Sequence, residues 1–207
     1  MDLSNPASAV VPTLDAAVLA VLVGTNRPLT GREVQRLCGH SQGRVQAILN
    51  RMTDHGLVDA VEAGPARLYT LNRDHVAAEA AVTLSNLRGR LFERMRKHLE
   101  QWSVQPVAAA VFGSAARGDG TPDSDIDVLI VRPAKVDPGD PRWDGAVDDL
   151  SRAIARWSGN HASIIQATPT QIAEMVKRGE PIVADLQEDA VPLTETPVLA
   201  PPRRARR

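Results

Sequence analysis

Two short apolar runs that meet polar motifs constrain the fold of this chain more than any other feature. The first run ends in Gly113-Ser114, and the second begins with Asp125-Ile126-Asp127. Because successive strand side chains point to opposite faces, Asp125 and Asp127 share one face, while Ile126 points to the other, into a core. Two carboxylates side by side on a strand repel each other. The pattern therefore predicts a divalent cation at this pair.

The Gly-Ser element adds a predicted phosphate site. A glycine at a strand end permits a tight turn or a close approach, and Ser114 is expected to cap a short helix that starts at Ala115. Free N–H groups at a helix start attract phosphate. The alternative is that Asp125 and Asp127 lie on a solvated edge strand, which an isolated Asp-x-Asp favours. The neighbouring Gly-Ser element favours a nucleoside triphosphate site instead.

These motifs resemble the signature of the nucleotidyltransferase superfamily that includes DNA polymerase beta, and most closely its minimal nucleotidyltransferase branch. That signature is Gly-Ser, then a short spacer, then Asp-x-Asp, often with Ala-Arg-Gly after the serine and Ser-Asp before the second strand. The matching residues are Gly113-Ser114, Ala116-Arg117-Gly118 and Ser124-Asp125-Ile126-Asp127.

The resemblance implies roles for these residues. Gly113 and Ser114 would hold the triphosphate, and Arg117 would add positive charge near it; a plain surface arginine is the alternative for Arg117. Asp125 and Asp127 would be the catalytic, magnesium-binding pair. The implied reaction is transfer of a nucleoside monophosphate to a hydroxyl of a protein, a small molecule or an RNA end.

The sequence departs from the family pattern at one position. Active members usually carry a third carboxylate on the next central strand, where it helps to deprotonate the attacking hydroxyl. The corresponding strand, 162–167, contains no Asp or Glu and places Ser163 at the expected position. General-base assistance is typically worth ~10²–10⁴-fold in rate. Enzymatic activity is therefore left open: the chain is a slow transferase, an enzyme that borrows a base from its substrate, or a nucleotide-sensing pseudoenzyme.

The N-terminal region is predicted to be a winged helix-turn-helix. Helices are expected over 14–23, 30–37 and 42–55, and strands over 57–62 and 67–71. Thr30 and Glu33 have capping-box spacing, and Gly56 stands where a glycine ends a helix. The pattern resembles bacterial winged-helix regulators.

In such a fold the 42–55 helix enters the major groove of DNA. Amide side chains read adenine edges, and arginine reads guanine or holds phosphate. The predicted DNA-binding residues are Gln42, Arg44, Gln46, Asn50, Arg51 and, in the wing, Arg67. The alternative is a protein-interaction module with a polar solvated helix face.

A long helix is predicted over 74–102, where apolar residues recur at three- and four-residue steps. It either forms a homodimer, which would present two winged helices to a two-fold DNA site, or connects and packs against its own domains.

The fold class is therefore α/β, more narrowly α+β, in four segments. These are a winged helix-turn-helix (1–72), a linking helix (73–104), a nucleotidyltransferase-like mixed sheet with flanking helices (105–193) and a disordered basic tail (194–207). The third segment has 8 basic and 14 acidic side chains, which fits a metal site, whereas 1–102 has 12 basic and 10 acidic. The single cysteine, Cys38, excludes an internal disulfide framework. The apolar run 14–23 is too short to span a bilayer, so no membrane partner and a cytoplasmic location are expected.

Overall fold

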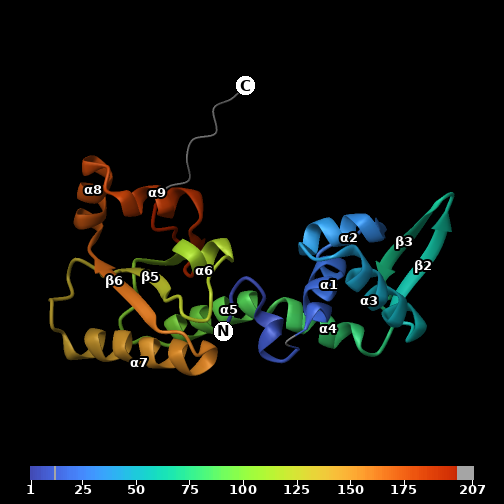
Figure 1. Ribbon diagram of the computed structural model, residues 1–207. Coiled ribbons are helices and arrows are strands. Elements are labelled where there is room, and N and C mark those ends of the chain that lie inside the picture. The colour runs from blue at the N-terminus through green and yellow to red at the C-terminus, as the bar shows by residue number, and fades with distance from the viewer. Residues whose placement is uncertain (12, 200–207) are drawn as a thin grey trace. The chain divides into compact units, whose positions relative to one another are not determined.

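A computed structural model describes residues 1–11 and 13–199 of the chain (Figure 1). The chain divides into two compact units. One comprises Asn5–Leu87, and the other comprises Met1–Ser4 together with the chain from Arg88 onward. Helices and two separate sheets make the chain an α+β protein, as predicted from the sequence.

The first unit has the predicted helix-turn-helix and wing. Its sheet is antiparallel, in the order β1-β3-β2. Its elements are η1 (Pro6–Ala9), α1 (Leu14–Val23), β1 (Leu29–Thr30), α2 (Gly31–Cys38), α3 (Gln42–Asp54), β2 (Val58–Ala63), β3 (Ala66–Leu71) and α4 (Ala78–Ser85). The expected apolar stripe of α3 is buried against the other helices and the sheet. This burial fixes which face of α3 remains polar and exposed.

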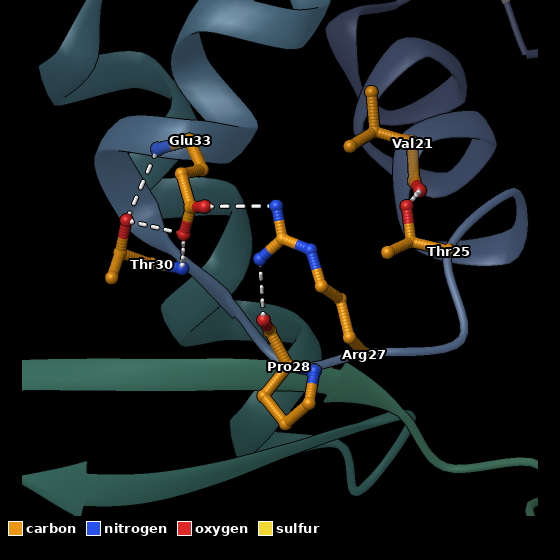
Figure 2. A network of polar contacts seen from close by, with 6 residues as sticks. All are labelled: Val21, Thr25, Arg27, Pro28, Thr30 and Glu33. Carbon is orange, nitrogen blue, oxygen red and sulfur yellow. Dashed lines mark hydrogen bonds and ion pairs between the residues drawn. The ribbon is translucent and has the colours of Figure 1, made fainter.

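The start of α2 shows why the turn before it is well defined (Figure 2). The Thr30 hydroxyl accepts a hydrogen bond from the Glu33 N–H at 3.2 Å, and the Glu33 carboxylate accepts one from the Thr30 N–H at 2.8 Å. Arg27 Nη2 donates to the same carboxylate at 2.9 Å. The backbone and hydroxyl bonds from Thr30, followed by Arg27, lower the pKa of Glu33 to about 2. The capping box predicted from the sequence is confirmed.

The single long helix predicted over 74–102 is wrong, because the structure forms two helices, α4 and α5 (Leu87–Glu100). The break lies at Asn86, whose φ of −108° and ψ of 21° are not helical. Ser and Asn compete with the backbone for hydrogen bonds and favour helix ends, and Ser85-Asn86 supplies both. The apolar side of α5 is buried in the core of its own unit, so this stripe is used within the chain.

The second unit is built on a mixed sheet in the order β6-β5-β4-β7. Strand β4 runs antiparallel to β5 and β7, and β5 runs parallel to β6. The elements that follow α5 are β4 (Ala108–Phe112), α6 (Gly113–Arg117), β5 (Ile126–Val131), α7 (Pro141–Ser158), β6 (Ala162–Ala167), α8 (Pro169–Arg178), α9 (Pro181–Glu188) and β7 (Val191–Pro192). The mixed sheet with flanking helices agrees with the sequence prediction.

The two faces of this sheet are covered differently. Helices α5 and α7 pack on the face that presents Val128 and Ile130. Helices α8 and α9 pack on the opposite face, around Leu129 and Val131; in Figure 1 they lie above the sheet and α7 lies below it. Strand alternation puts Asp127 on the face of Leu129, so the predicted acidic pair lies on the side of α8 and α9.

Both ends of the described chain pack in this second unit. Leu3 is 1% exposed, and its N–H donates to the Gly120 carbonyl at 2.8 Å. Val198 and Leu199 pack against the apolar cluster under α8 and α9, although the predicted disordered tail begins at residue 194. The rest of that predicted tail, 200–207, lies outside the described residues. No helix within 1–11 and 13–199 is long and apolar enough to cross a membrane.

Candidate functional site

The end of β4 brings the Gly-Ser motif against the acidic pair. Phe112 is paired across the sheet with Asp127, and Gly113 follows with a φ of +66°. A Cβ placed on Gly113 would lie 2.8 Å from Asp127 Oδ2. Gly113 therefore permits both the left-handed turn and the close approach of the carboxylate to the backbone.

The expected capping role of Ser114 is wrong. Helix α6 begins at Gly113, with Phe112 at the N-cap position, so Ser114 lies within the first turn. The positive φ of Gly113 completes the turn at the end of the strand, one residue earlier than expected. The Ser114 carbonyl accepts hydrogen bonds from the N–H groups of Gly118 and Asp119, at 2.9 and 3.1 Å.

Asp127 lies in an environment that disfavours its charge. Burial is the largest cause and raises its pKa, and the nearby carboxylates Asp125 and Asp185 raise it further. A hydrogen bond from Ser163 and the charge of Arg117 oppose this shift. Asp125 is exposed at the start of the strand, whereas Asp127 is half-buried. The pair therefore has an excess of negative charge that a cation would relieve.

The position opposite Asp127 on the neighbouring strand is a serine, as the sequence indicated. The register of β5 and β6 pairs Asp127 with Ser163, and β6 carries no acid. Asp185, on α9, is near enough for its charge to raise the pKa of Asp127, although burial is the larger cause. Sequence reasoning missed Asp185, because no local spacing relates it to the motif.

Arg117 is already engaged by carboxylates. Its Nε lies 3.2 Å from Asp119 Oδ2, and its Nη1 lies 3.2 Å from Asp189 Oδ2. These hydrogen bonds, that with Asp119 first, raise the pKa of Arg117. Asp189 caps the C-terminal end of α9, so Arg117 connects the motif to that helix. A ligand phosphate would have to share or displace these partners.

The loop before Asp125 is held by a buried amide. Asn160 is 2% exposed, and its Nδ2 donates to the carbonyls of Thr121, Pro122 and Ser124 at 3.3, 3.1 and 3.0 Å. Its Oδ1 accepts from the α-amino group of Met1 at 2.7 Å. The sequence carried no signal for this role, because Asn160 follows Gly159 in what reads as an ordinary turn.

The donor set fits magnesium, provided that a ligand completes the site. Within residues 1–11 and 13–199, no three His, Cys, Asp or Glu side chains form a group that could hold a metal ion. Magnesium usually takes one or two carboxylates together with phosphate oxygens and water. Asp125 and Asp127 supply two hard oxygen donors on one face, and burial, followed by the charges of Asp125 and Asp185, raises the pKa of Asp127. This arrangement suits an ion that arrives with phosphates.

In the first unit, α2, α3 and the wing enclose a groove of about 510 Å³. Three predicted DNA-binding residues line it, namely Gln42, Gln46 and Arg67. Arg32, at the start of α2, also lines it and was missed by sequence reasoning. Its only sequence signal was its place inside the capping box, between Thr30 and Glu33.

The predicted DNA-binding side chains differ in whether they already have a hydrogen-bond or ion-pair partner within the first unit. Gln46 Nε2 donates to the Tyr69 hydroxyl at 2.7 Å and to Asn50 Oδ1 at 2.9 Å. Arg51 pairs with Asp15 of α1. Arg67 lies 3.4 Å from a Glu62 carboxylate oxygen. Arg44 is exposed, and no partner for it exists in the described part of the chain.

Comparisons with known proteins match both units. Residues 92–178 match the family model of a nucleotidyltransferase domain, and residues 11–67 match the MarR family. A solved structure described as a predicted DNA-binding transcriptional regulator from E. coli is 26% identical, with a TM-score of 0.32; the match covers 39% of this chain and 81% of that one. A search of curated proteins finds no match. The chain thus joins an N-terminal MarR-family winged-helix domain to a C-terminal nucleotidyltransferase domain.

Proposed function

We propose that this protein is a transcription regulator whose nucleotidyltransferase domain binds a magnesium–nucleoside triphosphate complex and whose winged helix binds DNA. The observation that carries the nucleotide site is the contact of Gly113 with the Asp127 carboxylate. It joins the two halves of the family motif in one place. The winged helix acts on DNA, which implies a cytoplasmic location.

In this site Asp125 and Asp127 would hold the magnesium ion, and Gly113, Ser114 and Arg117 would contact the phosphates. Bound magnesium would neutralise phosphate charge and polarise the reacting phosphorus. Ser163 hydrogen-bonds Asp127, but a hydroxyl is not a base at neutral pH. The geometry therefore favours nucleotide sensing over rapid transfer.

Calorimetry with magnesium and each ribonucleoside triphosphate tests the site. Asp125→Asn combined with Asp127→Asn should abolish magnesium-dependent binding. Asp148→Asn combined with Asp149→Asn is the matched control, because it makes the same charge change on two exposed positions of α7. Unchanged affinity in the first double variant, with the fold intact by circular dichroism, would refute the assignment.

A second candidate is slow nucleotidyl transfer, which the approach of Asp185 to Asp127 favours. The acceptor hydroxyl would attack the α-phosphorus, its proton would pass to Asp185, and pyrophosphate would leave. Incubation with labelled triphosphates and cell lysate tests this reaction. Label on an acceptor that disappears with Asp185→Asn, while nucleotide affinity stays, supports transfer; binding without labelled product supports the sensor.

DNA binding rests on the exposed face of α3. Arg44→Ala combined with Asn50→Ala should weaken binding to DNA near the protein's own promoter, since each good base contact is worth about 1–3 kcal/mol. Arg94→Ala, at an exposed position of α5, is the charge-matched control. If the wild-type protein shifts no genomic fragment at low salt, the regulator hypothesis is wrong. Sedimentation in the same buffer tests the homodimer, which the sequence left open as one of two alternatives.

A further inference from the structure

A second arginine lies against the nucleotidyltransferase motif. A Cβ placed on Gly118 would lie 1.5 Å from Arg88 Nη1 and 2.6 Å from its Cζ. The guanidinium of Arg88, from the first turn of α5, therefore occupies the space in which a side chain of residue 118 would lie. Gly118 also has a φ of +82°. The left-handed φ thus favours glycine where α6 ends, and the Arg88 guanidinium fills the space beside it.

Arg88 differs from Arg117 in having no counter-ion. Within residues 1–11 and 13–199, no carboxylate pairs with its guanidinium and no carbonyl accepts a hydrogen bond from it. Arg117, which directly precedes Gly118, has two carboxylate partners. Arg88 is nevertheless half-buried. Removing a charge from water without a partner is unfavourable, so this position suits an anionic ligand.

Arg88 also lies close to the residues expected to hold phosphate. Gly118 is four residues after Ser114 and donates its N–H to the Ser114 carbonyl at 2.9 Å. Gly118 also directly follows Arg117, which the proposed function places at the phosphates. Guanidinium binds phosphate oxygens in pairs through its planar fork of N–H donors.

We propose that Arg88 binds the phosphates of the nucleotide, as a further ligand residue of the site; this inference rests on the proposed function. The residue is also the first of its unit, directly after Leu87, the last residue of the winged-helix unit.

The test compares Arg88→Met with wild type by calorimetry in the presence of magnesium, using the triphosphate, the monophosphate and the free nucleoside of each base. Loss of charged hydrogen bonds should weaken triphosphate binding about tenfold to hundredfold. Monophosphate binding should weaken less, and nucleoside binding should not change. Arg94→Met, an exposed arginine without a described partner on the same helix, should leave all three affinities unchanged.

Each outcome separates this inference from the proposed function. If wild type binds a triphosphate and Arg88→Met binds it equally well, the inference is wrong and the proposed function stands. Equal loss of triphosphate and nucleoside binding would show a structural role and overturn it too. If wild type binds no triphosphate, both fall. Should Arg88→Met fail to fold, Arg88→Gln decides, because wild-type triphosphate affinity without the positive charge would also overturn the inference.

Discussion

Asn160 gives the sharpest test of how the loop before Asp125 is held. Its two Nδ2 hydrogens serve three carbonyl oxygens at 3.0–3.3 Å, and its Oδ1 serves the α-amino group of Met1. Asn160→Ala removes these bonds from a side chain that is 2% exposed. With about 0.5–1.5 kcal/mol per hydrogen bond and a further cost for partners left unsatisfied, we expect a loss of about 2–4 kcal/mol. Asn160→Asp should lose at least as much, because a carboxylate would face three carbonyl oxygens.

Urea denaturation followed by tryptophan fluorescence measures this loss, since Trp102 and Trp143 are buried in the same unit. Gln101→Ala is the control, because Gln101 lies in the same unit, is exposed and has no side-chain hydrogen bond within the described residues. Magnesium-dependent nucleotide affinity should fall in parallel for Asn160→Ala, as Asp125 follows the released loop. If the unfolding free energy of Asn160→Ala lies within 0.5 kcal/mol of wild type and its nucleotide affinity is unchanged, the Asn160 amide does not order the site.

Three further predictions concern backbone and charge. Gly113→Ala should cost about 1–2 kcal/mol in unfolding free energy, because Gly113 has a left-handed φ, and should displace the Asp127 carboxylate. Gly145→Ala in α7, where a Cβ meets open space, should instead stabilise the protein by about 0.5–1 kcal/mol. Equal effects of the two variants in chemical denaturation would contradict this prediction. Asp127→Asn should raise the melting temperature at neutral pH, because burial and neighbouring carboxylates disfavour its charge; a lower value would show that the carboxylate is stabilised. The pKa of Glu33 is lowered from 4.5 to about 2. The stability that ionised Glu33 contributes to the folded protein is therefore complete above pH 4.5 and is lost as pH falls toward 2. The difference in unfolding free energy between wild type and Glu33→Gln should shrink over that interval, and a difference that grows there would contradict the prediction.

Elements with a strong local pattern could be predicted from the sequence. Alternation around Ile126 indicated both the strand and the shared face of its two acids, and Thr30 with Glu33 indicated a helix start. The break at Asn86 could not be read in the same way. Apolar periodicity continues on both sides of it, and the energetic cost of one non-helical residue is small compared with tertiary packing.

The residues that complete the candidate site were beyond sequence reasoning because each acts across a long stretch of chain. Asn160 bonds carbonyls more than 35 residues earlier, Asp185 approaches Asp127 from a different helix, and Arg88 meets Gly118 from α5. None of these pairs has a fixed sequence spacing. Their proximity depends on the order of strands in the sheet and on which helix covers which face.

The two chain segments that flank Asn5–Leu87 each contact one short segment of their own unit. Before Asn5, Leu3 is anchored to the carbonyl of Gly120; after Leu87, the Arg88 guanidinium lies on Gly118. The flanks that precede and follow Asn5–Leu87 are therefore held at Gly120 and Gly118, two positions separated by a single residue. A change in the backbone of residues 118–120 would therefore displace both flanks together.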